Sequence, residues 1–458
     1  MIKNWIKKNK IIVTLFSLVL ISRFIFMFIA FFVLGDQGFI NGCDVYLPAG
    51  LNFLTEGIFT NNVIEPLIPN SFPAPGYSIL LGFSWLIIPK YLFIVLWQNI
   101  MYALFIVFVY KFTRLFFNNN ISIISAILMA FEPFSFFWSN TVMSETPFLL
   151  FFMISIYSLA LSWHNQKYKY IIFSAIFLGL AALIRQIAFL FFPVIALITI
   201  IMLWRKTSLL KLAKLLIIFL FVFLAITAPW CIRNKIQFDS YTISNQTHLL
   251  YFLGAARDFL VLNEGISREE ADDHLKSLIV EKVGVDDFDQ VFLRDKYIPA
   301  IKEVNFSIIK SNPIVYLKLH LIKALPVFTD SGWQNILFFW KPDFNYTNSI
   351  NISSSLAQKD FSVMVSSLKN DNIFLMRVLG IIFWILIDLI ALIGLILMIL
   401  KKDLRRIGLV MLVIIGSFAF ASSWAAMARL RLPFQPFLLI FFTYAIYTFY
   451  LKFITKNE

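Results

Sequence analysis

Residues 11–34 read IIVTLFSLVLISRFIFMFIAFFVL, an apolar run interrupted by one charged residue, Arg23, near its middle. The run is longer than the apolar core of a signal peptide and long enough to cross a bilayer as a helix. Basic residues precede it, namely Lys3, Lys7, Lys8 and Lys10. Because positive charge is retained on the cytoplasmic side, we expect the N-terminus in the cytoplasm and residues 35–74 outside.

Similar runs recur along the chain, at roughly 75–88, 91–112, 119–138, 145–163, 170–184, 187–204, 210–229, 374–399, 407–424 and 432–451. Of the 458 residues, 60% are hydrophobic and 14% are charged, against about 25% charged in soluble proteins. The run at 75–88 is short for a span and reads as a shallow or re-entrant helix. We therefore predict an all-α polytopic membrane protein with about 10–11 membrane helices, about 10 of them true crossings.

The net charge of +13 invites a nucleic-acid interpretation. The lysines and arginines lie instead at the ends of apolar runs, as in the turns at 164–169, 205–214 and 400–406. This placement is typical of cytoplasmic loops. We therefore expect the membrane rather than a nucleic acid as a partner, with the C-terminus also in the cytoplasm.

Residues 230–372 differ from the rest of the chain because they hold most of its 26 acidic residues. Ser267–Lys282 has helical spacing and a Ser-x-x-Glu start, and Pro313–Pro326 reads as an amphipathic helix near the membrane. We predict a small, mainly helical outer domain here. The predicted division is an N-terminal membrane domain (1–229), the outer domain (230–372) and C-terminal membrane helices (373–458).

Two acids stand in the first outer loop, Asp36 and Asp44. A carboxylate beside an apolar wall at the membrane surface can have a raised pKa and act as a general base. The alternative is a solvated loop acid or a helix cap. The residues alone leave both interpretations open, with Asp44 and Asp36 as the two candidate bases.

Arginines stand where predicted spans meet the outer face: Arg185, Arg233, Arg429 and Arg431. The guanidinium group suits bidentate binding of phosphate. A single such arginine is usually an interfacial anchor, whereas several on one face favour a bound anionic headgroup. Glu145 opens a span on the same face, either as a residue that stabilises the helix dipole or as part of the site.

Charge also occurs within the spans, at Arg23 and Asp388. Such charges are costly and usually paired, so the two form a bridge with each other or line a path. The cysteines, Cys43 and Cys231, are both predicted outside, and whether they pair stays open. The scattered histidines show no metal-binding spacing, and no nucleotide-binding or hydrolase motif is present.

A series of short motifs, in order along the chain, resembles the GT-C glycosyltransferases of family 39, the protein mannosyltransferase and aminoarabinose transferase type. The matching residues are Asp44, Tyr46, Ala49, Leu54 and Gly57; PAPGY at Pro73–Tyr77; Pro133 with Ser144–Glu145; GLAALIR at Gly179–Arg185; PWCIRN at Pro229–Asn234; Asn312–His320; and Arg429–Pro436.

The resemblance implies an inverting transfer of a sugar from a polyprenyl-phosphate-linked donor to an acceptor on the outer face of a bacterial cytoplasmic (inner) membrane. It implies that Asp44 is the base and that Arg185 and Arg233 neutralise the leaving phosphate. The other expected substrate-binding residues are Tyr46, Tyr77, Glu145, Asn234, Arg429 and Arg431. No cofactor is indicated, and a divalent metal ion is left open.

The sequence does not determine the sugar, the acceptor, any metal requirement or the oligomeric state. The alternative function is a glycan polymerase or ligase, or a flippase for lipid-linked oligosaccharides, since these also combine outer loops with arginines. A solute transporter is a third class, but the chain shows none of the paired half-repeats common in transporters.

Overall fold

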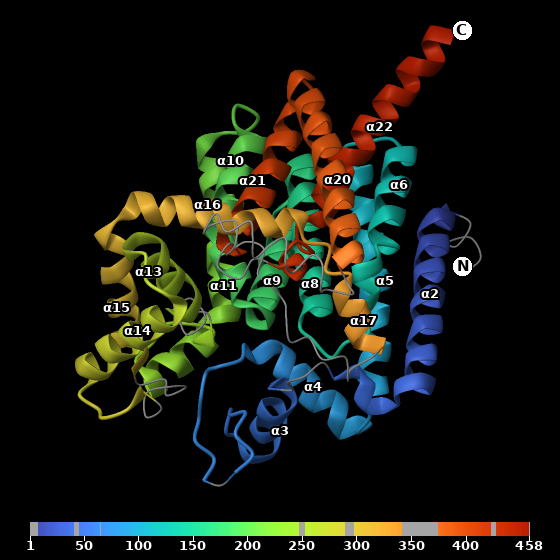
Figure 1. The fold of residues 1–458 in the computed structure, drawn as a ribbon. Coiled ribbons are helices and arrows are strands. Elements are labelled where there is room, and N and C mark those ends of the chain that lie inside the picture. Colours follow the sequence, from blue (N-terminus) through green and yellow to red (C-terminus); the bar gives the residue numbers. More distant parts are fainter. Residues whose placement is uncertain are drawn as a thin grey trace.

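A computed structural model describes residues 8–40, 45–64, 66–246, 252–288, 297–340, 374–422 and 427–457. Within these ranges the regular secondary structure is entirely helical. Most helices stand side by side in one bundle, and a smaller helical unit lies against its flank (Figure 1). The predicted all-α membrane architecture is confirmed.

Each apolar run predicted from the sequence is helical, and the run at 119–138 is divided into two helices. Those long and apolar enough to cross a membrane are α2 (Lys10–Leu34), α5 (Tyr91–Arg114), α8 (Glu145–Asn165), η2 with α10 (Gln186–Leu190 and Phe191–Leu203), α11 (Leu209–Phe238), α20 (Phe374–Leu400), α21 (Arg405–Ser422) and α22 (Gln435–Asn457). These make 8 spans by length and composition among the described residues, or 9 with one bent pair. The shorter α9 (Tyr168–Ile184) packs between α8 and α11. With α9 and the bent pair counted as crossings, the total equals the predicted number of about 10.

The bent pair is α6 (Asn119–Ala130) and α7 (Pro133–Ser139), which meet at 61°. The sequence had suggested one continuous segment here. Pro133 cannot continue the helix that precedes it, and Glu132 caps the new one. Its carboxylate accepts hydrogen bonds from the backbone N–H groups of Phe134 at 3.2 Å and Ser135 at 2.9 Å.

Arg23 is fully buried and holds this bend in place. Its guanidinium donates to the Ala130 carbonyl at 2.6 Å and to the hydroxyls of Ser135 and Ser139 at 2.7 and 3.1 Å. The predicted bridge between Arg23 and Asp388 does not form among the described residues. Arg23 instead bonds the Ala130 carbonyl at the helix break and the two serine hydroxyls of α7.

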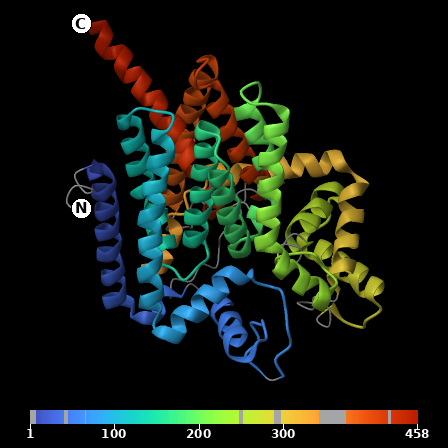
Figure 2. The same ribbon diagram turned by 180° about the vertical axis from the view of Figure 1, so that it is seen from behind.

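α3 (Tyr46–Glu56) and α4 (Pro75–Ile87) lie across one end of the bundle, which Figures 1 and 2 show from opposite sides. The oblique course of the 13-residue α4 agrees with the shallow helix predicted for 75–88. The two helices touch backbone to backbone, since a Cβ at Gly50 would overlap the Ser78 carbonyl and one at Gly82 would lie 2.8 Å from the Gly50 carbonyl. Glycine at both positions therefore sets their separation.

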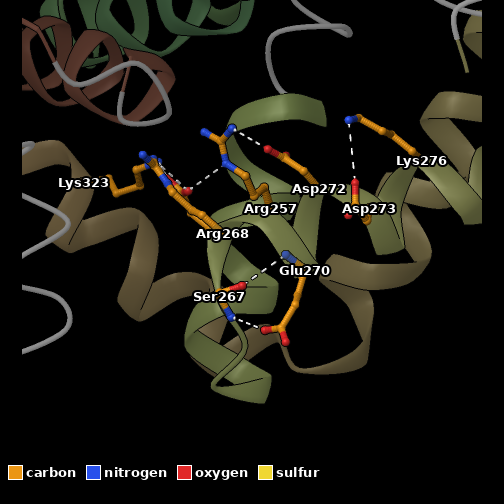
Figure 3. A network of polar contacts seen from close by, with 9 residues as sticks. Arg257, Ser267, Arg268, Glu270, Asp272, Asp273, Lys276 and Lys323 are labelled. Atoms are coloured by element: carbon orange, nitrogen blue, oxygen red, sulfur yellow. Dashed lines mark hydrogen bonds and ion pairs between the residues drawn. The ribbon is translucent and has the colours of Figure 1, made fainter. Parts of the chain in front are cut away.

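The flanking unit comprises α13 (Arg257–Glu264), α14 (Arg268–Val283), α15 (Ile298–Ser311) and α16 (Pro313–Thr329). It has a hydrophobic core of its own, which includes Phe259, Leu275 and Ile301. Both helices predicted in this region are confirmed, and α14 begins with the expected capping box of Ser267 and Glu270 (Figure 3). The exact domain boundaries stay a prediction, because α11 continues past the end of its apolar run at 229 to Phe238.

α16 joins this unit to the bundle, where it packs on α20 and α21. Asp258 fixes the joint, because it forms ion pairs with Lys323 of α16, with Arg257 at 3.3 Å and with Arg268 at 3.2 Å. Burial opposes ionisation of Asp258, but Lys323 and the two arginines outweigh burial and lower the pKa of this carboxyl. The network around Arg257, Arg268 and Lys323 is visible in Figure 3.

Candidate active site

The candidate site lies where α8 begins and α9 ends, at the same end of the bundle as α3 and α4. Arg185 follows α9 in an extended conformation, before the short turn η2. Its guanidinium forms an ion pair with Glu145, the first residue of α8. The Glu145 side chain is only 3% exposed, against 22% for Arg185. The arginine is thus the member of the pair that reaches solvent.

A pocket opens over this pair. It is lined by Glu145, Arg185, Arg429 and Ser422 among apolar side chains from α8, α21 and the segment before α22, namely Phe148, Leu149, Ile187, Leu430, Leu432 and Pro433. Arg429 lies in η6 (Ala428–Leu430), and its Nε is buried without a hydrogen-bond partner among the described residues. Two guanidinium groups and one carboxylate leave the pocket with a net positive charge, which suits an anion.

Tyr46 connects the first loop to this pocket. Burial and then the neighbouring Glu145 carboxylate raise the pKa of Tyr46, while Arg185 and Arg429 act in the opposite direction. The Tyr46 ring packs edge-on against Tyr77 of α4, with 5.1 Å between ring centroids. These four predicted substrate-binding side chains, Tyr46, Glu145, Arg185 and Arg429, are therefore brought together from four distant parts of the chain.

Tyr77 lies beneath this cluster and is fully buried. Its hydroxyl donates to Gln98 Oε1 at 2.6 Å, and the Gln98 amide donates to the Thr141 carbonyl at 2.8 Å. Tyr77 therefore ties α4 to α5 and to the segment that precedes α8, and supports Tyr46 from below.

The two candidate bases are placed differently. Asp36 is half-buried and caps α5, because its two oxygens accept from the backbone N–H groups of Tyr91 at 3.1 Å and Leu92 at 2.8 Å. Asp44, the predicted base, lies outside the described residues, as does Cys43. Cys231 is buried in α11.

Arg233 and Asn234 do not line the pocket. Arg233 donates to the Asn70 carbonyl at 3.0 Å and stacks over Trp230 with 5.0 Å to the ring centroid. The buried Asn234 amide donates to the Thr242 carbonyl at 2.7 Å. Arg233 thus attaches the end of the first loop to α11, and Asn234 attaches the segment that follows α11. Their predicted contact with substrate stays a prediction.

Arg431 is fully buried although it lies two residues from Arg429. It donates to the carbonyl groups of Val327, Phe328 and Asp330 at 3.1, 2.8 and 2.7 Å, which are the free acceptors at the end of α16. Its guanidinium also stacks on Trp384 at 3.5 Å. The structure places this arginine beneath the pocket, where it anchors α16.

An apolar groove adjoins the charged pocket. It runs between α10 and α21 and is lined by Leu190, Phe191, Val194, Val413, Gly416, Ser417, Phe420 and Ala421. Ala421 in the groove and Ser422 in the pocket are consecutive residues of α21. The groove has a volume of about 460 Å³ and the charged pocket about 10 Å³, so the charged pocket must widen before a phosphate group can enter it.

Sequence reasoning missed Glu132, a buried acid whose charge acts on both Arg23 and Arg431. The signal was an acid inside an apolar run, the same signal that identified Arg23 and Asp388. Ser422 was missed because a serine in a span has no distinctive pattern. Among the described residues, no three His, Cys, Asp or Glu side chains are grouped as a metal site would require.

Comparisons with known proteins give a sequence family match for part of the chain and similar folds among solved structures. Residues 73–232 match the sequence model of the family described as dolichyl-phosphate-mannose-protein mannosyltransferase. No curated protein sequence matches the chain.

Among solved structures, the apo oligosaccharyltransferase of Archaeoglobus fulgidus is similar with a TM-score of 0.52 and 14% identity, over 98% of this chain and 51% of that one. The archaeal oligosaccharyltransferase from the same organism, in complex with an inhibitory peptide and a dolichol-phosphate, has a TM-score of 0.48 and 13% identity, over 99% and 52%. The chain thus spans about half the length of these relatives. The predicted GT-C membrane fold is confirmed.

Proposed function

We propose, from the GT-C fold, that this chain is an inverting glycosyltransferase that moves a sugar from a polyprenyl-phosphate-linked donor to an acceptor at the outer membrane surface. The observation that carries the proposal is the pocket in which Arg185 and Arg429 face the same space beside an apolar groove. The mannosyltransferase family match at 73–232 supports the same class of donor.

The arginines act on the leaving group. An acceptor oxygen attacks the anomeric carbon, the bond from that carbon to the phosphate oxygen breaks, and polyprenyl phosphate departs with the electron pair. Negative charge grows on the phosphate as this bond breaks. Arg185 and Arg429 stabilise that charge most strongly in the transition state, because they are already held in place in a partly desolvated pocket.

Glu145 is a positioning residue in this scheme. Its pairing with Arg185 orients the guanidinium toward the pocket. Tyr46 and Tyr77 hold the first loop over the same site. Arg233, Asn234 and Arg431 remain proposed substrate contacts, although their described hydrogen bonds favour a supporting role.

Asp44 is the proposed base that removes the proton of the acceptor. The chain on both sides of it is fixed beside the start of α8, since the Val142 N–H donates to the Phe39 carbonyl at 2.9 Å and Tyr46 adjoins Glu145. Asp44 precedes Tyr46 by two residues, a length of chain that reaches at most about 7 Å. Asp36 suits the role less well, because both of its oxygens already cap α5.

The groove between α10 and α21 is the proposed path of the polyprenyl tail. Its lining is apolar, and Leu190 and Phe420 are 58% and 61% exposed, as expected where a bound lipid meets the bilayer. A lipid that lies in this groove brings its phosphate directly to Ser422 and the two arginines.

The orientation rests on the distribution of charge. The start of α2 and the end of α5 lie at the end of the bundle away from α3 and α4 (Figure 1). Lys10 and Arg114 are the residues at these two helix ends, and Lys167 and Lys401 lie in the connections that follow α8 and α20. The positive-inside rule puts that end and both termini in the cytoplasm. The candidate site then faces the outside of a bacterial inner membrane, and the acceptor is a protein, lipid or glycan.

The test uses protein reconstituted in liposomes with radiolabelled polyprenyl-phosphate sugars as a donor panel and a membrane fraction as acceptor. We expect release of free polyprenyl phosphate that is abolished by Asp44→Asn and retained by Asp36→Asn. Turnover that survives Asp44→Asn excludes this base. Movement of donor lipid across the bilayer without release of polyprenyl phosphate would instead identify a flippase.

A further inference from the structure

A second charged pocket lies at the opposite end of the bundle, between the start of α2 and the end of α5. It has a volume of about 610 Å³ and is lined in part by four cationic side chains, Lys8, Lys10, Lys111 and Arg114. The length of α5 separates this pocket from the candidate site. Leu92 at the start of α5 lies beside Asp36, and Arg114 at its other end is about 33 Å away along the helix axis.

The charge of this pocket is not balanced by the protein. No acidic residue lines it. Among the described residues, none of the four cations forms an ion pair with a carboxylate. Arg114 donates to the Phe117 carbonyl at 3.0 Å, and the Lys111 ammonium lies 5.2 Å from the Phe108 ring centroid. Like charges held around one cavity repel each other unless an anion joins them.

The cations lie at the ends of two helices: Lys10 is the first residue of α2, with Lys8 two positions before it, and Lys111 and Arg114 lie in the last turn of α5. Lys111 and Arg114 are three positions apart, which places them on one face of α5. Lys8 and Lys10 approach from α2, and Tyr157 of α8 and the buried Tyr110 complete the wall. A lysine that only sets the orientation of a helix in the membrane, such as Lys167, does not have to lie beside other cations around one pocket.

The position of the pocket favours a lipid as the source of the anion. α2 packs against α5, η1 and α7, but only 22% of its most apolar stretch is buried in the protein. Residues such as Leu18 and Ile25, further along α2, are exposed and face the bilayer. Basic pockets between membrane helices on the cytoplasmic side are suited to phosphate-bearing headgroups.

We propose that this pocket binds the headgroup of an anionic phospholipid with more than one phosphate, whose acyl chains lie along α2. The volume is that of a small-molecule site. The bound lipid neutralises the four cations and attaches α2 to the bundle. The proposal concerns a site separate from the transferase pocket and does not depend on the reaction catalysed there.

The test is native mass spectrometry of the full chain with tetraoleoyl cardiolipin as the probe and a neutral phosphatidylcholine as the comparison. We expect one cardiolipin to be retained. In Lys111→Gln/Arg114→Gln it should bind about thirtyfold more weakly, at about 1 kcal/mol for each lost cation. The control, Lys167→Gln/Lys169→Gln, removes the same charge from the same end of the bundle without touching the pocket.

Equal retention of phosphatidylcholine, an unchanged affinity in Lys111→Gln/Arg114→Gln, or an equal loss in the control would each overturn the proposal. A salt titration of the unaltered protein gives a readout that needs no variant, since cardiolipin retention should fall as ionic strength rises. Displacement of the lipid by free pyrophosphate at equal concentration would assign the pocket to a soluble phosphate and refute the lipid assignment.

Discussion

Replacement of Arg185 by glutamine separates the catalytic role of this residue from its structural one. The change removes one of two donors to the leaving phosphate, and loss of one such donor costs about 10²–10³ in turnover. It also leaves the Glu145 carboxylate, which is 3% exposed, without its partner. Breaking a buried pair from one side costs about 3–5 kcal/mol of stability.

The double variant Glu145→Gln/Arg185→Gln resolves the two effects. It removes both charges and leaves two amides that can hydrogen-bond, so its thermal stability in detergent should return close to that of the unaltered protein. Its turnover should stay about 10²–10³-fold below that of the unaltered protein, because the donor to phosphate is still missing. Glu145→Gln alone keeps Arg185 and a hydrogen-bond acceptor, and should lose no more than about tenfold.

The assay is release of labelled polyprenyl phosphate under single-turnover conditions, paired with thermal unfolding of each variant in the same detergent. Recovery of turnover together with stability in the double variant would refute the reasoning. Arg185 would then be a structural partner of Glu145 and not a ligand of the phosphate.

Three further outcomes follow from the described contacts. Asp36→Ala should destabilise the protein by about 0.5–2 kcal/mol through loss of the α5 cap, with turnover per folded molecule unchanged in the liposome assay. Gly50→Ala should lower the free energy of unfolding by about 1–3 kcal/mol, because the new Cβ overlaps the backbone of α4. Its control is Gly416→Ala, which should leave the free energy of unfolding unchanged, since nothing lies within 4 Å of the new Cβ. Burial lowers the pKa of His320 below its usual 6.5, so the unfolded chain binds this proton at a higher pH than the folded protein does. Stability should therefore decline as pH falls below about 6.5. His320→Gln, which can still bond the Phe420 carbonyl, should flatten that decline in melting curves recorded between pH 5 and 8.

The fold was predictable from hydropathy because lipid-facing helices need unbroken apolar runs. The bend at Glu132–Pro133 also had a local signal, although the run at 119–138 was read as one segment. The end of α11 had no such signal in the sequence. Hydropathy identifies only the segment in contact with lipid, whereas this helix continues through a more polar stretch to Phe238.

The candidate site was predictable only in part. Arg185, Arg429 and Glu145 were identified as charged residues at the ends of spans, because the ends of apolar runs can be located from the sequence alone. The same signal selected Arg431, whose described hydrogen bonds are to carbonyl groups at the end of α16. Which arginine faces the pocket depends on contacts between segments a hundred residues apart, and no local pattern encodes them.

The central claim is that the phosphate of the donor lipid lies between Arg185 and Arg429. The most direct measurement is a cryo-electron microscopy map of the protein with bound polyprenyl phosphate. We predict phosphate density within about 3 Å of both guanidinium groups, with the tail in the groove between α10 and α21. Phosphate density elsewhere, with that pocket empty, would contradict the account.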